Sequence, residues 1–339
     1  MKPLLIAFVA AVSFFSASAF QLCRAQTVTI AAPEYAALKL FDSSPGRTIT
    51  GMGASSNGDL FYLESDAAFP PALVTTLSKR IASDNYATPT PLFAFSTPAF
   101  GAFVVFHEGT VYFGESSAGT IHAIAADGSG HRLLGTVPGV YDLSFSGGDP
   151  YVSSNPETDF SKPPRNEISR FDLTTGALDS ILDTGGDFSG PLEFDADGNL
   201  LYGATAVGTI RDLHSFTPSE VATAFGPGTL SLSPPSHRLI ANGKNVYLAF
   251  GGGASLWKED FNTLTLHDLV TRGSRAIATT TDTFGQLDAP AGNLLVTVTS
   301  FAAGRSAVFA VEPIPEPSIA CLLLLGALPL FRTRTGARR

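Results

Sequence analysis

AFVVFHEGTVYFGESSAGTIHAIAADGSGHRLLG, residues 102–135, is the stretch that decides the fold. Short apolar and aromatic runs alternate in it with turn residues. Glu108-Gly109 is a hairpin turn between the first two runs, residues 116–119 join the second to the third, and Asp127-Gly128 joins the third to the fourth. The third strand is expected at residues 120–125. The stretch therefore predicts one small antiparallel sheet of four strands.

The second strand of this unit recurs along the chain. It reads GDLFYLES (58–65), GTVYFGES (109–116), GDPYVSSN (148–155), GNLLYGAT (198–205), KNVYLAFG (244–251) and GNLLVTVT (292–299). Equivalent positions are Asp59, Thr110, Asp149, Asn199, Asn245 and Asn293. Their spacings of 51, 39, 50, 46 and 48 residues are typical of propeller blades. Residues 27–312 number 286, about 48 for each of six blades. The sequence predicts an all-β, six-bladed β-propeller.

VYFGESSAGTIHAIAADGSGHRLL, within the second repeat, resembles a blade of the YWTD/NHL class of six-bladed propellers. Tyr112-Phe113-Gly114-Glu115 stands where that class has its signature tetrapeptide, although the last three residues depart from the strict motif. The other five repeats match only as a pattern. The resemblance supports the fold and implies no particular partner.

A propeller must also close its ring. The last repeat offers three strands, at residues 275–281, 293–299 and 306–312. We expect its fourth strand to come from residues 35–41 and to pair beside Val308-Phe309, which covers an otherwise open sheet edge. Residues near 38 should then lie next to residues near 309.

Residues 1–25 have the layout of a secretory signal peptide. Lys2 is followed by an apolar stretch at residues 4–15 and by small residues that end at Ala19. A second cleavage site is predicted after Ala25. The preceding Gln21-Leu22 argues against Cys23 as a lipoprotein cysteine. The sequence predicts a signal helix that is removed after Ala19 or Ala25.

Residues 313–339 form a second terminal segment. The proline-spaced EPIPEP linker cannot continue a sheet, and residues 319–331 are a thirteen-residue apolar run. As a helix this run spans about 20 Å at about 1.5 Å per residue, short of a hydrocarbon core of about 30 Å. The arginines that follow it favour a cytoplasmic C-terminus; they are Arg332, Arg334, Arg338 and Arg339.

This tail is similar to the PEP-CTERM protein-sorting signal, through Pro315-Glu316-Pro317, the apolar run and the terminal arginines. The apolar run is shorter than usual, contains Pro329, and precedes dispersed arginines. The resemblance implies a Gram-negative producer of exopolysaccharide, in which an exosortase recognises Pro315-Glu316-Pro317 and removes the tail. It also implies transient membrane insertion through a short C-terminal helix. A simple tail anchor is the alternative.

Charge and cysteine content narrow the functions of the body between these termini. Six of the 21 basic residues but one of the 30 acidic residues lie in residues 1–25 and 313–339, so the body has a net charge of about −14. Such a charge repels nucleic acids and anionic membranes. The two cysteines, Cys23 and Cys321, lie in the termini. The body therefore has no thiol for catalysis or for a disulfide.

Candidate chemistry is sparse. Glu64 and Glu115 have matching positions at the ends of the second strands of two consecutive repeats. Six-bladed lactonases bind a divalent metal at the mouth of the channel, near such strand ends. A site of this type would need further ligands from other repeats. The equivalents in the other repeats are Ser154, Ala204, Phe250 and Val298. Two acids without further ligands make a weak metal site, so a solvated or turn-capping role is the favoured interpretation of both carboxylates. The loop DADGN (195–199) lacks the later ligands of a calcium loop and is interpreted as a turn.

Two hypotheses follow. The first is an exported, non-catalytic β-propeller at the cell surface or in the exopolysaccharide matrix, with transient or residual attachment to the inner membrane, that uses no cofactor and binds glycan or a surface protein. The second is a secreted metal-dependent hydrolase or lactonase that uses Glu64 and Glu115. Three or more carboxylate or amide groups within coordinating distance at one channel opening would favour the enzyme.

Overall fold

The computed structural model describes residues 26–67, 74–157, 162, 167–183, 190–203, 213–222, 238–242, 245–250, 262–268, 270–271, 274–290 and 293–314. The predicted signal segment, with Ala19 and Ala25, and the predicted sorting tail from Pro315 onward lie outside these residues. No helix in the described part of the chain has both the length and the apolar character to cross a bilayer.

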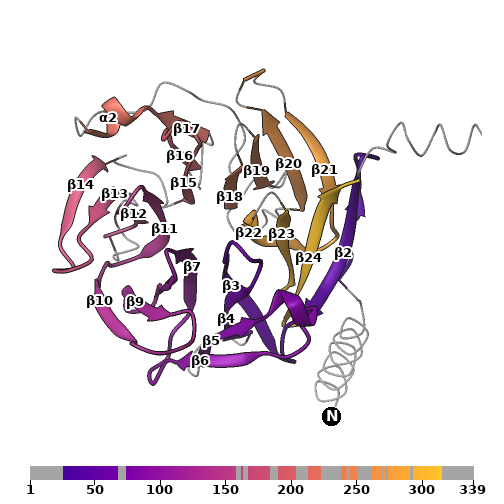
Figure 1. Ribbon diagram of the computed structural model, residues 1–339, viewed down its shortest axis with the longest axis horizontal. Coiled ribbons are helices and arrows are strands. Elements are labelled where there is room, and N and C mark those ends of the chain that lie inside the picture. Colours follow the sequence, from indigo (N-terminus) through magenta and orange to yellow (C-terminus); the bar gives the residue numbers. More distant parts are fainter. Residues whose placement is uncertain are drawn as a thin grey trace, which may run out of the picture.

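The described strands form six sheets around one axis, which is a six-bladed β-propeller (Figure 1). The first three blades each contain four consecutive strands. Blade 1 consists of β3 (Arg47–Ala54), β4 (Leu60–Asp66), β5 (Thr75–Arg80) and β6 (Thr90–Ala94). Blade 2 consists of β7 (Gly101–His107), β8 (Thr110–Glu115), β9 (Thr120–Ala125) and β10 (Arg132–Thr136). Blade 3 consists of β11 (Val140–Ser146), β12 (Asp149–Ser154), β13 (Glu167–Phe171) and β14 (Leu178–Asp183).

The remaining blades differ in their outer strands. Blade 4 has three described strands, β15 (Leu192–Phe194), β16 (Leu200–Gly203) and β17 (Leu213–Phe216). Blade 5 has β18 (Arg238–Asn242), β19 (Asn245–Phe250), β20 (Thr263–Asp268), β21 (Ser274–Thr279) and, outermost, β1 (Thr29–Ile30). Blade 6 has β22 (Thr283–Asp288), β23 (Leu294–Ser300), β24 (Arg305–Pro313) and, outermost, β2 (Tyr35–Asp42). The described helices are η1 (Ala82–Asp84) and α2 (Pro218–Ala222).

Local sequence sets the blade boundaries as predicted. The second strands begin within one residue of the six equivalent positions, and the third strand of blade 2 spans Thr120–Ala125 as expected. Glu108 and Gly109 both have positive φ, 46° and 82°, between the paired residues His107 and Thr110. Two positive φ angles in a two-residue loop match the right-handed twist of the flanking strands. Gly109 adopts such an angle without steric cost.

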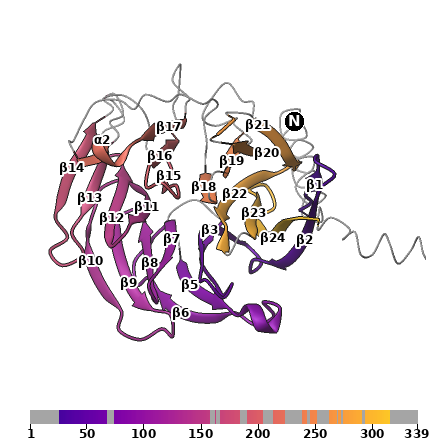
Figure 2. The ribbon, with the colours of Figure 1, turned by 45° about the horizontal axis from the view of Figure 1, so that its top comes forward.

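The predicted ring closure is confirmed. β2 pairs with β24, with Leu38 opposite Ala310 and Lys39 opposite Phe309. β1 adds a second, unpredicted contact, because Thr29 pairs with Thr279 on β21 of blade 5. The first described strands thus complete two neighbouring blades built from the end of the chain (Figure 2).

One part of the prediction for the last blade is wrong. The segment 275–281, predicted as a strand of blade 6, contributes β21 to blade 5, and the innermost strand of blade 6 is β22. The sequence of β22, TFGQLD (283–288), shows no alternation of apolar and polar residues. The pairing of β22 with β23 shifts register between Phe284 and Leu287, so successive side chains do not alternate regularly between the two faces of the sheet. A Cβ atom on Gly285 would lie 2.5 Å from Thr297 Oγ1, so a small residue is required at this bulge. Neither feature has a clear signature in sequence.

The hydrophobic core is divided among the seams between blades. Each of five apolar clusters joins two consecutive blades, and the described residues cover the seams 1–2, 2–3, 3–4, 5–6 and 6–1. Aromatic rings cross several of these seams. Phe61 of blade 1 stacks on Phe106 of blade 2 at a centroid distance of 5.6 Å. Stability therefore depends on the contact of each blade with its neighbours.

The closing seam provides a test. The Phe41 side chain is buried on β2, its ring centroid is 5.5 Å from that of Tyr62, and the Arg80 guanidinium lies 4.2 Å from its centroid. Phe41→Ala is expected to lower the free energy of unfolding by about 3–5 kcal/mol. Leu38→Ala, on the same strand but 66% exposed, is the matched control and is expected to stay within about 0.5 kcal/mol of the parent. Urea unfolding measures both, and equal losses would contradict the role of β2 in closure.

Candidate functional site

Two hollows are lined mainly by residues of the innermost strands. The first, which we call the mouth cavity, measures about 170 Å³ and lies at the N-terminal ends of β3, β7 and β22. It is lined by Thr48, Ile49, Thr50, Phe100, Gly101, Thr283, Gly285, Gln286, Thr299 and Phe301. These side chains are uncharged. Phe301 is 67% exposed, so an aromatic face stands at the rim beside several hydroxyl groups.

The second hollow, the acidic cavity, measures about 230 Å³ and is lined by the innermost strands of blades 1, 2, 3, 4 and 6. Its polar side chains are His107, Asp142, Ser144, Glu193, Gln286 and Asp288. Gln286 also lines the mouth cavity and is therefore the residue common to both hollows. Its side chain is 7% exposed.

The carboxylates of the acidic cavity connect adjacent blades. Innermost strands have no strand partner on their axial edge, so side chains must satisfy some of their backbone N–H groups. Asp288 Oδ2 of blade 6 accepts the Ala54 N–H of blade 1 at 2.6 Å, and Asp142 Oδ2 of blade 3 accepts the Leu192 N–H of blade 4 at 3.2 Å. These carboxylates therefore hold the ring together as well as lining its centre.

Glu193 differs because a side chain from blade 3 contacts it. Ser144 Oγ donates to Glu193 Oε1 at 3.0 Å, and the Phe194 N–H donates to the same oxygen at 2.9 Å. Protein atoms surround the carboxyl group even though it faces a cavity. This burial raises the pKa of Glu193 to about 8, with Asp142 and Asp288 adding to the shift. At neutral pH Glu193 is therefore mainly a protonated acid that can donate a hydrogen bond into the cavity.

Asp288 shows the same effect more weakly. Burial raises its pKa to about 6, and the N–H groups of Ala54 and Ala289 limit the shift by stabilising the ionised form. His107, at the end of β7, stacks on Phe145 with a centroid distance of 3.9 Å. Its buried Nε2 has no hydrogen-bond partner. The cavity thus contains one protonated acid, two further carboxyl groups and an imidazole.

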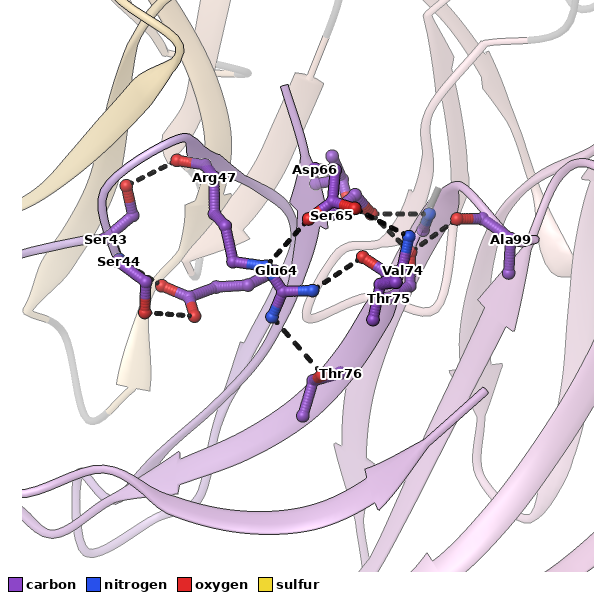
Figure 3. Close-up of polar contacts among 12 residues, drawn as sticks. Ser43, Ser44, Arg47, Glu64, Ser65, Asp66, Val74, Thr75, Thr76 and Ala99 are labelled. Atoms are coloured by element: carbon purple, nitrogen blue, oxygen red, sulfur yellow. Dashed lines mark hydrogen bonds and ion pairs between the residues drawn. The ribbon is translucent and has the colours of Figure 1, made fainter. Parts of the chain in front are cut away.

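The two predicted metal candidates lie at the mouth end of blades 1 and 2, but neither lines the mouth cavity. Glu64 accepts hydrogen bonds from the Ser44 N–H at 2.8 Å and from Ser44 Oγ at 2.9 Å (Figure 3). Ser44 lies between β2 and β3, so Glu64 holds the connection between the closing blade and blade 1. In the same region Arg47 contacts Asp66, Thr76 and the Val74 carbonyl (Figure 3).

Glu115 caps its own loop. Its carboxylate accepts the N–H groups of Ser117, Ala118 and Thr120 and the hydroxyl of Thr120. Of the equivalent positions, Ser154 and Val298 are buried in their blades, Ala204 lies outside the described residues, and only the backbone of Phe250 is described. In the part of the chain that the structure describes, no three His, Cys, Asp or Glu side chains are placed to share one metal ion.

The DADGN loop is a turn, as interpreted from the sequence. Asp195 Oδ1 accepts the N–H groups of Asp197 and Asn199, each at 2.9 Å, and Gly198 has a φ of 77°. These contacts close the hairpin between β15 and β16.

Sequence reasoning missed the residues that line the two cavities. Asp142, Glu193 and Asp288 lie seven, six and five residues before the second-strand positions of their repeats, so they do not align with one another. Each is an acid within an apolar segment, as in VYDLSFS (140–146), PLEF (191–194) and FGQLD (284–288). An isolated acid in an innermost strand was the available signal, but its significance depends on knowing which strands face the axis.

No protein-family model matches the chain, and no curated protein is a significant match in sequence. Solved structures do match in fold. A gluconolactonase from Xanthomonas campestris has a TM-score of 0.58 at 15% identity, with 86% of this chain and 96% of that chain covered. The PQQ-bound aldose sugar dehydrogenase of Streptomyces coelicolor has a TM-score of 0.51 at 13% identity, with 85% and 99% covered.

A chain of a nidogen/laminin complex also matches, with a TM-score of 0.51, 14% identity, and 68% of this chain and 80% of that chain covered. At these identities the similarity is one of fold alone. The class that the fold defines is therefore the six-bladed β-propeller, with solved neighbours of the gluconolactonase type. That class includes enzymes as well as a chain found in a protein–protein complex, so the fold does not decide between catalysis and binding.

The raised pKa values predict how stability depends on pH. Because the folded protein holds protons on Glu193 and Asp288 that the unfolded chain releases near pH 4, the free energy of unfolding should fall as the pH rises from about 4 to about 8. Glu193→Gln, which resembles the protonated acid, should flatten this dependence and be more stable than the parent at pH 9. The exposed Glu312→Gln is the control and should follow the parent. Thermal unfolding at pH 5 and pH 9 tests this, and a Glu193→Gln profile parallel to the parent's would contradict the assignment.

Proposed function

We propose that this protein is an exported, non-catalytic binding module that recognises carbohydrate at its mouth cavity. The observation that carries the proposal is the exposed Phe301 ring beside a largely apolar hollow whose lining also includes uncharged threonine and glutamine side chains. A sugar ring presents C–H groups to an aromatic face and hydroxyls to hydroxyl and amide partners. Thr48, Thr50, Thr283, Thr299 and Gln286 offer such partners.

Charge and cavity size restrict the ligand. The body has a net charge of about −14, which opposes an acidic polysaccharide. A cavity of about 170 Å³ is below the range of about 300–1,000 Å³ typical of drug-sized ligands, so it suits one sugar unit, such as a chain end or a branch. The proposed ligand is therefore a neutral glycan.

The two termini support the proposed location. A signal peptide and a PEP-CTERM-like tail would carry the protein to the cell surface or into the exopolysaccharide matrix, with an exosortase as the processing partner and the C-terminal helix as a transient membrane contact. A neutral-glycan site is suited to that location. The net negative charge of the body also opposes nucleic acid as a partner.

A secreted hydrolase or lactonase is the second candidate, and Glu193 is the observation that favours it. A protonated carboxyl group beside the second carboxyl group of Asp142 is an arrangement used for general acid catalysis. This candidate places the chemistry in the acidic cavity and not at Glu64 and Glu115. Hydrolysis of a sugar lactone that is abolished in Glu193→Gln, and that in the parent falls as the pH rises above about 8, would favour the enzyme.

Binding is tested with an array of neutral and acidic oligosaccharides, followed by calorimetry on the neutral glycan that binds best. Phe301→Ala should weaken binding by about 5- to 30-fold, because stacking on an aromatic ring contributes on the order of 1–2 kcal/mol. Leu133→Ala removes a similarly exposed apolar side chain, 58% exposed on the outer strand of blade 2, and should bind as the parent does. Binding confined to acidic glycans, or unaffected by Phe301→Ala, would refute the proposal.

Sorting is tested separately in a host that has an exosortase. Glu316→Ala should retain the tail, which is seen as a larger mass and as protein left in the inner membrane. Glu312→Ala, four residues upstream, is the control and should be processed like the parent. An intact C-terminus in the parent would rule out the sorting signal without affecting the glycan proposal.

A further inference from the structure

Two histidines meet head-on at the seam between blades 1 and 2, away from both cavities. His122 lies on β9 and is 8% exposed, whereas His131, just before β10, is exposed. His122 Nδ1 and His131 Nε2 are 3.1 Å apart. The ring centroids are 5.2 Å apart and the ring planes differ by 22°. The centroid separation is close to the distance between His122 Nδ1 and His131 Nε2 plus the radii of the two rings. The two nitrogens therefore point directly at one another.

A chain of hydrogen bonds determines which nitrogen carries the proton. The Glu115 carboxylate, which accepts three backbone N–H groups, also accepts the Thr120 hydroxyl at 2.9 Å. Thr120 Oγ1 therefore accepts the N–H of His122 Nε2, at 2.9 Å. In neutral His122 this leaves a lone pair on Nδ1, which accepts the N–H of His131 Nε2.

His122 is neutral at physiological pH. Burial, together with the neighbouring His131, lowers the pKa of His122 to about 4, against the opposing effect of Glu115. Partial desolvation of its ring by the neighbouring protein atoms also lowers the pKa of His131. A neutral imidazole whose second N–H is tied through a hydroxyl to a carboxylate is the arrangement that histidine ligands of metals adopt.

The surroundings favour a low coordination number. The Phe93 ring stacks on His131 at 4.2 Å, the Phe113 ring stacks on His122 at 5.2 Å, and Phe95 meets His122 edge-on at 5.3 Å. These rings occupy the flanks where a tetrahedral ion would need its other ligands. No third His, Cys, Asp or Glu ligand joins the pair among the described residues. Aromatic faces do, however, tolerate a cation nearby.

We propose that His122 and His131 form a two-coordinate site for a soft monovalent d¹⁰ ion, Cu⁺ or Ag⁺, bound in line between His122 Nδ1 and His131 Nε2. The ion replaces the proton that the two nitrogens share. That proton moves to His131 Nδ1, so binding changes the His131 tautomer and releases no net proton. Two metal–nitrogen bonds of about 2.0 Å need the nitrogens about 4 Å apart, so His131 must withdraw by about 1 Å. Its exposed position after the Asp127-Gly128 turn leaves room for this movement.

The test uses Ag⁺, which is stable in air, in chloride-free nitrate buffer. The protein is the full chain with Cys23→Ser and Cys321→Ser, so that thiols do not bind the ion. Calorimetry at neutral pH should show one Ag⁺ bound per chain, with a heat independent of the ionisation enthalpy of the buffer. His131→Gln, a change at an exposed position, should abolish this binding, and His107→Gln, on a different seam, should leave it intact.

Two further measurements separate a metal site from a purely structural pair. Thr120→Val removes the acceptor that orients His122, and should weaken Ag⁺ binding by about 10–100-fold without removing either ligand. Zn²⁺ should bind more weakly than Ag⁺, because two histidines do not complete the tetrahedral coordination that Zn²⁺ prefers. Absence of stoichiometric Ag⁺ binding, its persistence in His131→Gln, or tighter binding of Zn²⁺ would each overturn the proposal.

Discussion

The pairing of β2 with β24 is the contact on which the rest of the structure depends. A ring of sheets has no single central core, and each blade buries its faces only against its neighbours. Unless the first strands of the chain join the last blade, blades 6 and 1 lose the seam that contains Phe41, Tyr62 and Leu295. The pairing of β1 with β21 strengthens this closure by binding the same segment to blade 5. The separation of the innermost strands, and hence the two cavities, follows from a closed ring.

The axial edges of the innermost strands explain why polar side chains collect at the centre. Their backbone N–H groups lack strand partners, and side chains from adjacent blades satisfy them. Asp288 and Asp142 do so with carboxylates, while Ser306 and Ser65 do so with hydroxyls, for Ile49 and Gly101. A carboxylate in this position serves structure and at the same time lines a cavity. This double role is why an acidic centre alone does not identify an enzyme, and why the rim, where Phe301 is exposed, carries the functional proposal.

Much of the architecture followed from local pattern. The six second strands, the Glu108-Gly109 hairpin and the β2–β24 closure were all predicted correctly, because turn chemistry and the apolar pattern of a strand act over a few residues. β22 was missed, and residues 275–281 were placed in its blade, because a bulge at Gly285 and Gln286 interrupts the strand pattern of β22. Glu64 and Glu115 were chosen because they align in the repeat, yet both cap loops. Residues that align between repeats occupy equivalent positions in different blades. Such positions lie apart around the ring, so their side chains need not meet.

The sequence by itself determined the number of blades, the order of strands within them and the acidic, cysteine-free character of the body, because each depends on residues that are near one another or on composition. Only the tertiary structure decided which side chains share a cavity and which histidine nitrogens meet. Asp142, Glu193 and Asp288 lie on three different blades, and His122 meets Phe93 and Phe95 across a seam. Such contacts depend on how sheets stack around an axis, and this stacking is set by the sum of many weak apolar contacts that no short segment encodes.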